Sequence, residues 1–135
     1  MTKSKIIVVV RNDLEPWQEL NVTAFLMSGI IGANPEIIGA EYHDSEGLLY
    51  LPLCQQPVIV LYGPANLLRN IRMRANNRGV LTAVYIEEMF KTDHDAANRE
   101  IFSNHGPAET NTVGIAFRTE SKLADKISKG ASMRK

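Results

Sequence analysis

The opening of the chain constrains the fold more than any other segment. Residues 6–10 are an unbroken run of β-branched side chains, which predicts a strand buried on both faces. A charged turn follows, and residues 16–31 then form an apolar segment that begins with proline and predicts a helix. Arg11 and Asp13 are therefore expected just beyond the carboxyl end of a strand, where α/β sheets most often bind ligands.

The remaining sequence alternates between strand-like and helix-like segments. Further strands are expected over 57–62, 80–86 and 112–117, and a hairpin is expected over 37–51. Helices are expected over 65–78, 93–102 and 119–130, and the last two would be capped by Asp93 and Thr119. No repeat and no long linker divides these segments. The pattern predicts a single domain spanning residues 1–135, with a three-layer α/β/α fold and a mixed, mainly parallel sheet of four or five strands.

Composition narrows the class of protein. The 135 residues are 44% hydrophobic, which is enough for one core, and their net charge of zero argues against a general polyanion binder. A single cysteine excludes an internal disulfide framework and fits a reducing compartment. No apolar run is long enough to cross a bilayer or to serve as a signal peptide. We therefore expect a cytoplasmic protein that does not enter a membrane.

The helix predicted over residues 65–78 is rich in arginine, because the segment 64–79 contains four arginines and no acid. On a helical projection Arg69 and Arg72 fall on one flank, whereas Arg74 and Arg78 fall on the other. The four side chains do not form the continuous basic face that follows a phosphate backbone. tRNA is therefore a partner that this pattern allows but does not favour.

The first predicted helix is apolar around nearly its whole circumference. Such a helix is buried on more than one side, either within the domain or under a second subunit, and we therefore expect a homodimer. A narrow sector carries small or polar residues and one tryptophan: Trp17, Asn21, Ala24 and Ser28. This sector is either a close contact with the sheet or part of a pocket wall.

Several motifs occur in a characteristic order along most of the chain. They are Val9-Val10-Arg11-Asn12-Asp13-Leu14, the strand 57–62 with the helix 67–78 and Gly79, Glu88-Met89-Phe90-Lys91-Thr92, and the strand 112–116 followed by residues 123–128. In this order they resemble the type II peptidyl-tRNA hydrolases. The segments 13–25 and 85–90 more narrowly resemble a bacterial family of unknown function that shares the hydrolase fold.

The resemblance also shows where the chain departs from the hydrolases. That family carries a lysine, a glutamine and a histidine after its first elbow, and the matching positions here are Leu20, Ala24 and Met27. A leucine can neither hold an RNA phosphate nor stabilise a developing oxyanion. The family's aspartate after the third strand corresponds to Glu88, while the threonine is retained as Thr92.

Two hypotheses of function follow, and whether the protein is an enzyme stays open between them. The first is a module that binds a small polar or anionic ligand, or another protein, in a pocket framed by polar side chains. Its residues would be Arg11, Asp13, Asn21, Glu88 and Thr92, with Trp17 at the rim. The alternative is a hydrolase of peptidyl-tRNA or a related acyl ester, with Glu88 as the base and Thr92 and Asp13 in support.

Neither a metal nor an organic cofactor is expected. The three histidines, His43, His94 and His105, lack metal-ligand spacing, and the chain contains none of the glycine motifs that bind dinucleotides or nucleoside phosphates. Asp93-His94-Asp95 is better explained as the capped start of a helix than as a cation site.

Overall fold

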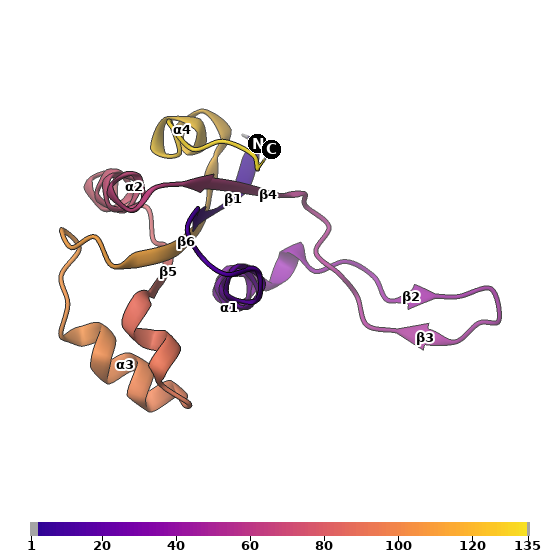
Figure 1. Ribbon diagram of the computed structural model, residues 1–135. Coiled ribbons are helices and arrows are strands. Elements are labelled where there is room, and N and C mark those ends of the chain that lie inside the picture. Colours follow the sequence, from indigo (N-terminus) through magenta and orange to yellow (C-terminus); the bar gives the residue numbers. More distant parts are fainter. Residues whose placement is uncertain (1–2, 135) are drawn as a thin grey trace.

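The computed structural model describes residues 3–134. Its strands are β1 (Ser4–Arg11), β2 (Tyr42–His43), β3 (Leu49–Tyr50), β4 (Val58–Gly63), β5 (Ala83–Ile86) and β6 (Thr112–Glu120). Its helices are α1 (Pro16–Ala33), α2 (Ala65–Asn77), α3 (Asp95–Ser103) and α4 (Ser121–Ile127), with 3-10 turns η1 (Pro35–Ile37) and η2 (Glu87–Lys91). Figure 1 shows their arrangement around one main sheet.

The main sheet has four strands in the order β4–β1–β6–β5. Strand β1 is parallel to β4, whereas β6 is antiparallel to both of its neighbours, β1 and β5. The sheet is mixed, as predicted, but it is not mainly parallel. The reason lies in the connection that contains α3. Because it leaves β5 and enters β6 at the same edge of the sheet, β6 runs antiparallel to β5.

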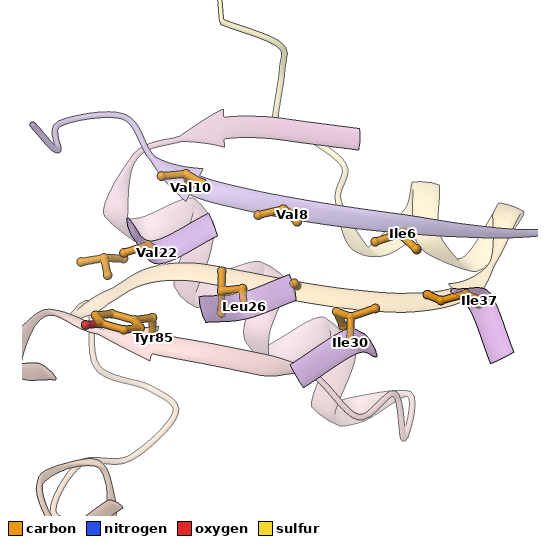
Figure 2. Close-up of a cluster of buried hydrophobic side chains, with 10 residues drawn as sticks. Ile6, Val8, Val10, Val22, Leu26, Ile30, Ile37 and Tyr85 are labelled. Carbon is orange, nitrogen blue, oxygen red and sulfur yellow. The ribbon is translucent and has the colours of Figure 1, made fainter. Parts of the chain in front are cut away.

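The three layers follow from the unbroken apolar run in β1. Val8 and Val10 point to the face covered by α1, while Ile7 and Val9 point to the face covered by α2 and α4. Figure 2 shows the first set above the buried side of α1. All of these side chains are buried, and β1 lies between two other strands, which confirms the placement of this segment at the centre of the sheet.

Helix α1 differs from the expectation that it is buried on several sides. Only Val22, Leu26 and Ile30, which recur every fourth residue, are buried against the sheet. Leu20 is 75% exposed and Phe25 is 55% exposed. Part of the apolar surface of α1 is therefore not covered by any other segment of the described residues. None of the helices in residues 3–134 is long and apolar enough to cross a membrane.

Several local boundaries also differ from the predicted ones. His94, and not Asp93, caps α3 by accepting a hydrogen bond from the next turn, and Glu120, rather than Thr119, caps α4. The predicted third strand is short and begins at Ala83. The segment after it forms η2, so Glu87 and Glu88 lie on a tight helical turn instead of a strand end.

The predicted hairpin is present, and it stands apart from the rest of the molecule. Residues 40–53, here called the arm, contain the two-stranded ribbon of β2 and β3 and project away from the sheet and helices (Figure 1). At its base the backbone N–H of Gly39 donates to the carbonyl of Leu53 at 3.0 Å. All of the arm's residues except Pro52 are exposed.

Candidate functional site

A cleft of about 830 Å³ lies between α1, the edge strand β5 and the segment formed by η2 and α3. Its walls combine aromatic rings with short polar side chains, among them Trp17, Asn21, Phe25, Ser28, Tyr85, Phe90, Thr92, Asn98 and Phe102. A concave surface of this size and mixed chemistry is typical of a binding site for a small molecule.

Four of the rings form a continuous aromatic wall. The ring of Trp17 meets Phe90 edge-on at 5.9 Å between centroids, Phe90 packs against Tyr85 at 5.2 Å, and Tyr85 against Phe25 at 6.0 Å. Two of these rings come from α1, one from β5 and one from η2. The wall therefore depends on the tertiary fold, and its rings offer flat apolar surface to a ligand.

Polar groups interrupt this wall at defined positions. The Thr92 hydroxyl donates to the carbonyl of Met89 at 2.9 Å and also contacts the side-chain amide of Asn98. Asn21 is exposed one helical turn after Trp17 and makes no side-chain hydrogen bond within the described residues. Burial raises the pKa of the Tyr85 phenol, which therefore stays a neutral donor at physiological pH.

Charged residues at the start of α3 line one side of the cleft. Arg99 pairs with Asp95 one turn earlier in the same helix, and both side chains are exposed. The Nδ1 atom of His94 accepts the backbone N–H of Ala97, while its Nε2 atom lies 3.8 Å from Asp93. Arg99 is thus matched by a neighbouring carboxylate, and this side carries no excess of positive charge.

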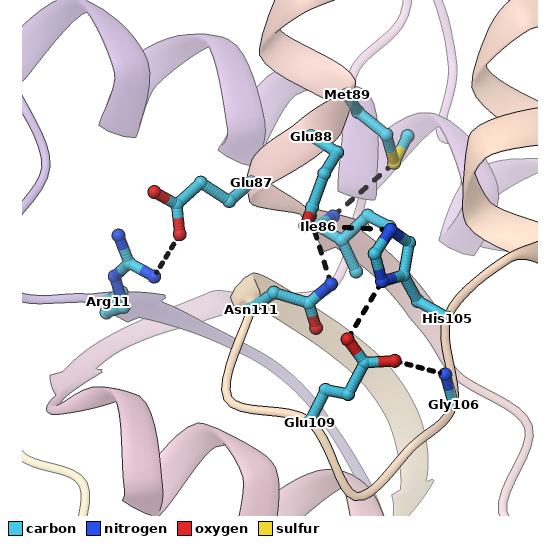
Figure 3. A network of polar contacts seen from close by, with 9 residues as sticks. All are labelled: Arg11, Ile86, Glu87, Glu88, Met89, His105, Gly106, Glu109 and Asn111. Atoms are coloured by element: carbon cyan, nitrogen blue, oxygen red, sulfur yellow. Dashed lines mark hydrogen bonds and ion pairs between the residues drawn. The ribbon is translucent and has the colours of Figure 1, made fainter.

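Arg11, at the end of β1, is held by two carboxylates outside the cleft. Its Nε atom donates to Asp13 at 2.6 Å. Its Nη1 atom donates to Glu87 at 3.1 Å, as Figure 3 shows. Burial opposes the charge of this guanidinium, but its hydrogen bonds to Asp13 and Glu87 outweigh the effect of burial and raise the pKa of Arg11. The carboxylates that hold Arg11 are thus those of Asp13 and Glu87, and not that of Glu88.

Glu88 points to the other side of η2, toward the loop that precedes β6. It accepts a hydrogen bond from the Asn111 amide at 3.0 Å, and its second oxygen lies 3.6 Å from Nε2 of His105. Glu109 contacts Nδ1 of the same imidazole at 2.8 Å. Figure 3 shows this carboxylate–imidazole–carboxylate row. The hydrogen bond to Glu109 raises the pKa of His105.

The six residues proposed from the sequence consequently divide between two places. Trp17, Asn21 and Thr92 line the cleft, whereas Arg11, Asp13 and Glu88 do not. Arg11 and Glu88 do follow strands that end at the same edge of the sheet, as expected. The carboxylate row and the cleft are nevertheless separate, because the side chains of η2 point in different directions (Figure 3).

The arginines of α2 are used within the fold. Arg72 is buried, stacks over the ring of Phe102 at 5.3 Å and donates to the hydroxyl of Thr112 at 3.3 Å. Arg74 donates to the carbonyl of Ile127, the last residue of α4, and to that of Lys129, just after the helix. Two of the three arginines within α2 therefore tie the helix to neighbouring segments.

The chain is similar to proteins whose function is also unknown. Residues 4–135 match DUF2000, a family described as proteins of unknown function. The chain belongs to this family. A solved structure of a protein of unknown function from Agrobacterium tumefaciens strain C58 is 49% identical, with a TM-score of 0.97 over 100% of both chains. No curated protein matches the chain.

Several residues of this DUF2000 protein's site were not singled out from the sequence. Phe25, Phe90 and Phe102 lie far apart in the chain, so no spacing connects them before the fold is known. The spacing of His105 and Glu109 was a weak sequence signal for their contact, because an i,i+4 pair of opposite charge can meet on a local turn. Within residues 3–134, no three His, Cys, Asp or Glu side chains are grouped so as to hold a metal ion.

Proposed function

We propose that this protein binds a small molecule with a flat apolar or aromatic body and hydrogen-bonding groups. The observation that carries the proposal is the cleft of about 830 Å³, where an aromatic wall is combined with the polar side chains of Asn21, Thr92 and Asn98. Rings supply affinity for a flat body, and a few fixed polar groups set its orientation.

The charges around the cleft favour a neutral ligand over an anionic one. Arg11, the cation expected to hold an anion, is engaged by Asp13 and Glu87 away from the cleft. Arg99 lines the cleft but is paired with Asp95. An anionic ligand would have to displace this carboxylate, which reduces its net gain. The amides of Asn21 and Asn98 can instead bind neutral carbonyl or hydroxyl groups.

A titration with two naphthalene probes tests the proposal. We expect neutral 2-naphthol to bind, to shift the amide NMR signals of α1, β5 and α3, and to bind more tightly than naphthalene-2-sulfonate. Trp17 is the single tryptophan of the chain and stands at the cleft, so its indole N–H signal should also move. Absence of binding by calorimetry, or shifts confined to another part of the molecule, would contradict the proposal.

A filled cleft provides the decisive variant. Asn21→Trp adds a large ring to an exposed position of α1 that lines the cleft, without removing a buried contact. We expect it to weaken 2-naphthol binding at least tenfold. Asn70→Trp places the same ring at an exposed position of α2, on the other face of the sheet, and should bind the probe like the wild type. Equal loss in both variants would indicate non-specific binding.

One observation keeps hydrolysis as a second candidate function. Glu88 faces His105, which Glu109 contacts from the other side, and such a row can orient a base or move a proton. Thr92 and Asp13, the proposed supporting groups, lie elsewhere, and this weakens the candidate. The test is turnover of an acyl-tRNA by the purified protein. Under this hypothesis Glu88→Gln and His105→Gln both abolish turnover.

A further inference from the structure

The arm exposes an apolar surface that no other segment of residues 3–134 covers. Its large side chains, each exposed by about half or more, are Tyr42, Leu48, Leu49, Tyr50, Leu51 and Leu53. Leu51 alone is 83% exposed. None of them belongs to either hydrophobic cluster of the domain. Tyr42 and Tyr50 are paired on one face of the ribbon, whereas Leu49, paired with His43, lies on the other, so the apolar side chains are distributed over both faces. Exposed apolar side chains gathered on one projecting segment mark a contact with another molecule.

Polar contacts at the tip hold the arm in a defined shape. The carboxylate of Asp44 accepts the backbone N–H groups of Glu46 and Leu48 at 2.9 and 3.0 Å, and the hydroxyl of Tyr50 at 2.7 Å. A two-stranded ribbon is marginally stable alone in water. Here its turn is ordered while its apolar side chains stay uncovered, so the arm is preorganised to bind a partner.

The structure of the Agrobacterium protein supports a fixed arm. A TM-score of 0.97 over 100% of both chains requires that the arm project from the domain in the same way in both. The two sequences differ at about half of their positions, since they are 49% identical. The projection is therefore a property of the fold and not of one sequence.

A second apolar surface runs along α1, on the flank opposite the cleft. This α1 outer flank consists of residues that recur at i, i+4, i+7 and i+11, namely Leu20, Ala24, Met27 and Ile31. Leu20 and Ala24 are exposed, whereas Met27 and Ile31 are half-buried and also pack against the core beneath the helix. At 100° per residue, Asn21 and Phe25 fall on the other flank, which faces the cleft. In Figure 1 the arm and α3 lie on opposite sides of α1, so the outer flank is on the side of the arm.

The two surfaces match in length but do not meet within one chain. Each leg of the arm has about seven residues and reaches roughly 20 Å, at about 3.3 Å per residue. The 18 residues of α1 extend over about 27 Å. The arm projects away from its own helix (Figure 1), so it cannot cover the outer flank of the same copy.

The exposed area is large enough for a stable pair of chains. With roughly 200 Å² for a fully exposed side chain of this size, the arm's large residues present on the order of 700 Å² over the two faces of the ribbon, and about half of this area can face one helix. Together with the outer flank, that half supplies a large part of the about 800 Å² per partner that a stable protein interface buries. Because one chain carries both surfaces, a two-fold pair uses each of them twice and closes on itself.

We propose that two copies of the chain form a dimer in which the arm of each copy packs along the α1 outer flank of the other. This arrangement buries both apolar surfaces and leaves the cleft, on the opposite flank of α1, open in each copy. The proposal does not depend on what the cleft binds.

Oligomeric state provides the first test. Light scattering at micromolar concentration should give the wild type twice the chain mass of 15.0 kDa. The double variant Leu49→Glu/Leu51→Glu and the single variant Leu20→Glu should each give the mass of one chain. All three positions are exposed within the chain, so the variants keep their own core, which circular dichroism can verify.

Leu81→Glu is the matched control, because Leu81 is 89% exposed but lies in neither surface, just before β5. It should remain dimeric. A monomeric wild type, or dimers that persist in the arm variant, would overturn the proposal. Dissociation of the Leu81→Glu variant would also overturn it, because a charge added at any exposed position would then be enough to dissociate the dimer.

Crosslinking tests which surfaces meet. In a Cys54→Ala background, the variants Leu20→Cys and Leu51→Cys are prepared separately and mixed with a short thiol-to-thiol crosslinker. We expect crosslinked dimers mainly in the mixture. Crosslinks confined to the Leu51→Cys sample would show that arms pair with arms, and an absence of crosslinks in the mixture would likewise overturn the arrangement.

Discussion

At the scale of single residues, His105 links the loop before β6 to the rest of the site. Its Nδ1 atom contacts Glu109 at 2.8 Å, and the second oxygen of Glu109 accepts the backbone N–H of Gly106 at 2.7 Å. The hydrogen bond between the side chains raises the pKa of His105 and lowers that of Glu109. The pair is solvent-accessible, so its contribution to stability is modest.

The direction of these pKa shifts predicts a pH window for the pair. His105 contributes fully below its ordinary pKa of 6.5, and its contribution is lost as the pH rises through the raised folded value. Glu109 contributes above its ordinary 4.5, and its contribution is lost as the pH falls through the lowered value. The pair should therefore stabilise the fold most between pH 4.5 and 6.5.

Urea denaturation of Glu109→Gln tests this window. The stability difference from wild type should be larger at about pH 6 than at about pH 9, where His105 is neutral. Glu100→Gln, which removes an exposed carboxylate of α3, should show no such change with pH. Equal differences at both pH values would mean that Glu109 acts through Gly106 and Arg72 and not through His105.

At the scale of elements, the close packing of α1 against β6 determines where the cleft forms. Gly114 in β6 lies beneath the helix, and a Cβ atom there would meet Val22 Cγ1 at 2.4 Å and Leu26 Cδ1 at 2.9 Å. Both of those side chains are buried, so neither can move aside freely. The absence of a side chain at Gly114 therefore lets the helix approach the sheet.

Gly114→Ala should destabilise the protein by about 1–3 kcal/mol, because the added methyl group overpacks the core beneath α1. Gly32→Ala is the matched control: its Cβ would meet nothing within 4 Å, and alanine favours a helix, so stability should rise by about 0.5–1 kcal/mol. Thermal or urea unfolding measures both. A neutral effect at Gly114 would show that α1 can shift on the sheet.

The sequence predicted most elements because local patterns determine them. The β-branched run of β1 and the proline at the start of α1 placed both elements correctly. The direction of β6 was not predictable in the same way, because it depends on whether the connection through α3 crosses the sheet or returns at the same edge. Exposure of Leu20 and Phe25 was missed for a similar reason: an apolar pattern does not say whether a partner surface exists in the same chain.

The candidate site was only partly accessible from the sequence. Arg11 and Asp13 are two residues apart after a strand, so their pairing could be foreseen. The choice between Glu87 and Glu88 depended on η2, whose turn sends the two side chains in different directions (Figure 3). The aromatic wall comes from three separate elements, and no local pattern connects them.

At the scale of the whole molecule, the domain and the arm are separable parts. Both hydrophobic clusters are built from residues outside 40–53. The base of the arm is closed by backbone hydrogen bonds between Gly39 and Leu53 and between Gln55 and Ile37. The core and the cleft can therefore form without the arm, whereas the proposed dimer cannot.

Replacement of residues 41–52 by an Asn-Gly turn separates these roles. Because a dimer unfolds to two chains, the Tm of the wild type should fall by roughly 2 °C for each tenfold dilution. The shortened protein should fold as a monomer whose Tm does not change with concentration, and it should bind 2-naphthol as the wild type does. Calorimetry over a range of protein concentrations measures the first effect, and titration the second. If the shortened protein failed to fold, the arm would belong to the core; if its Tm still depended on concentration, another surface would hold the chains together.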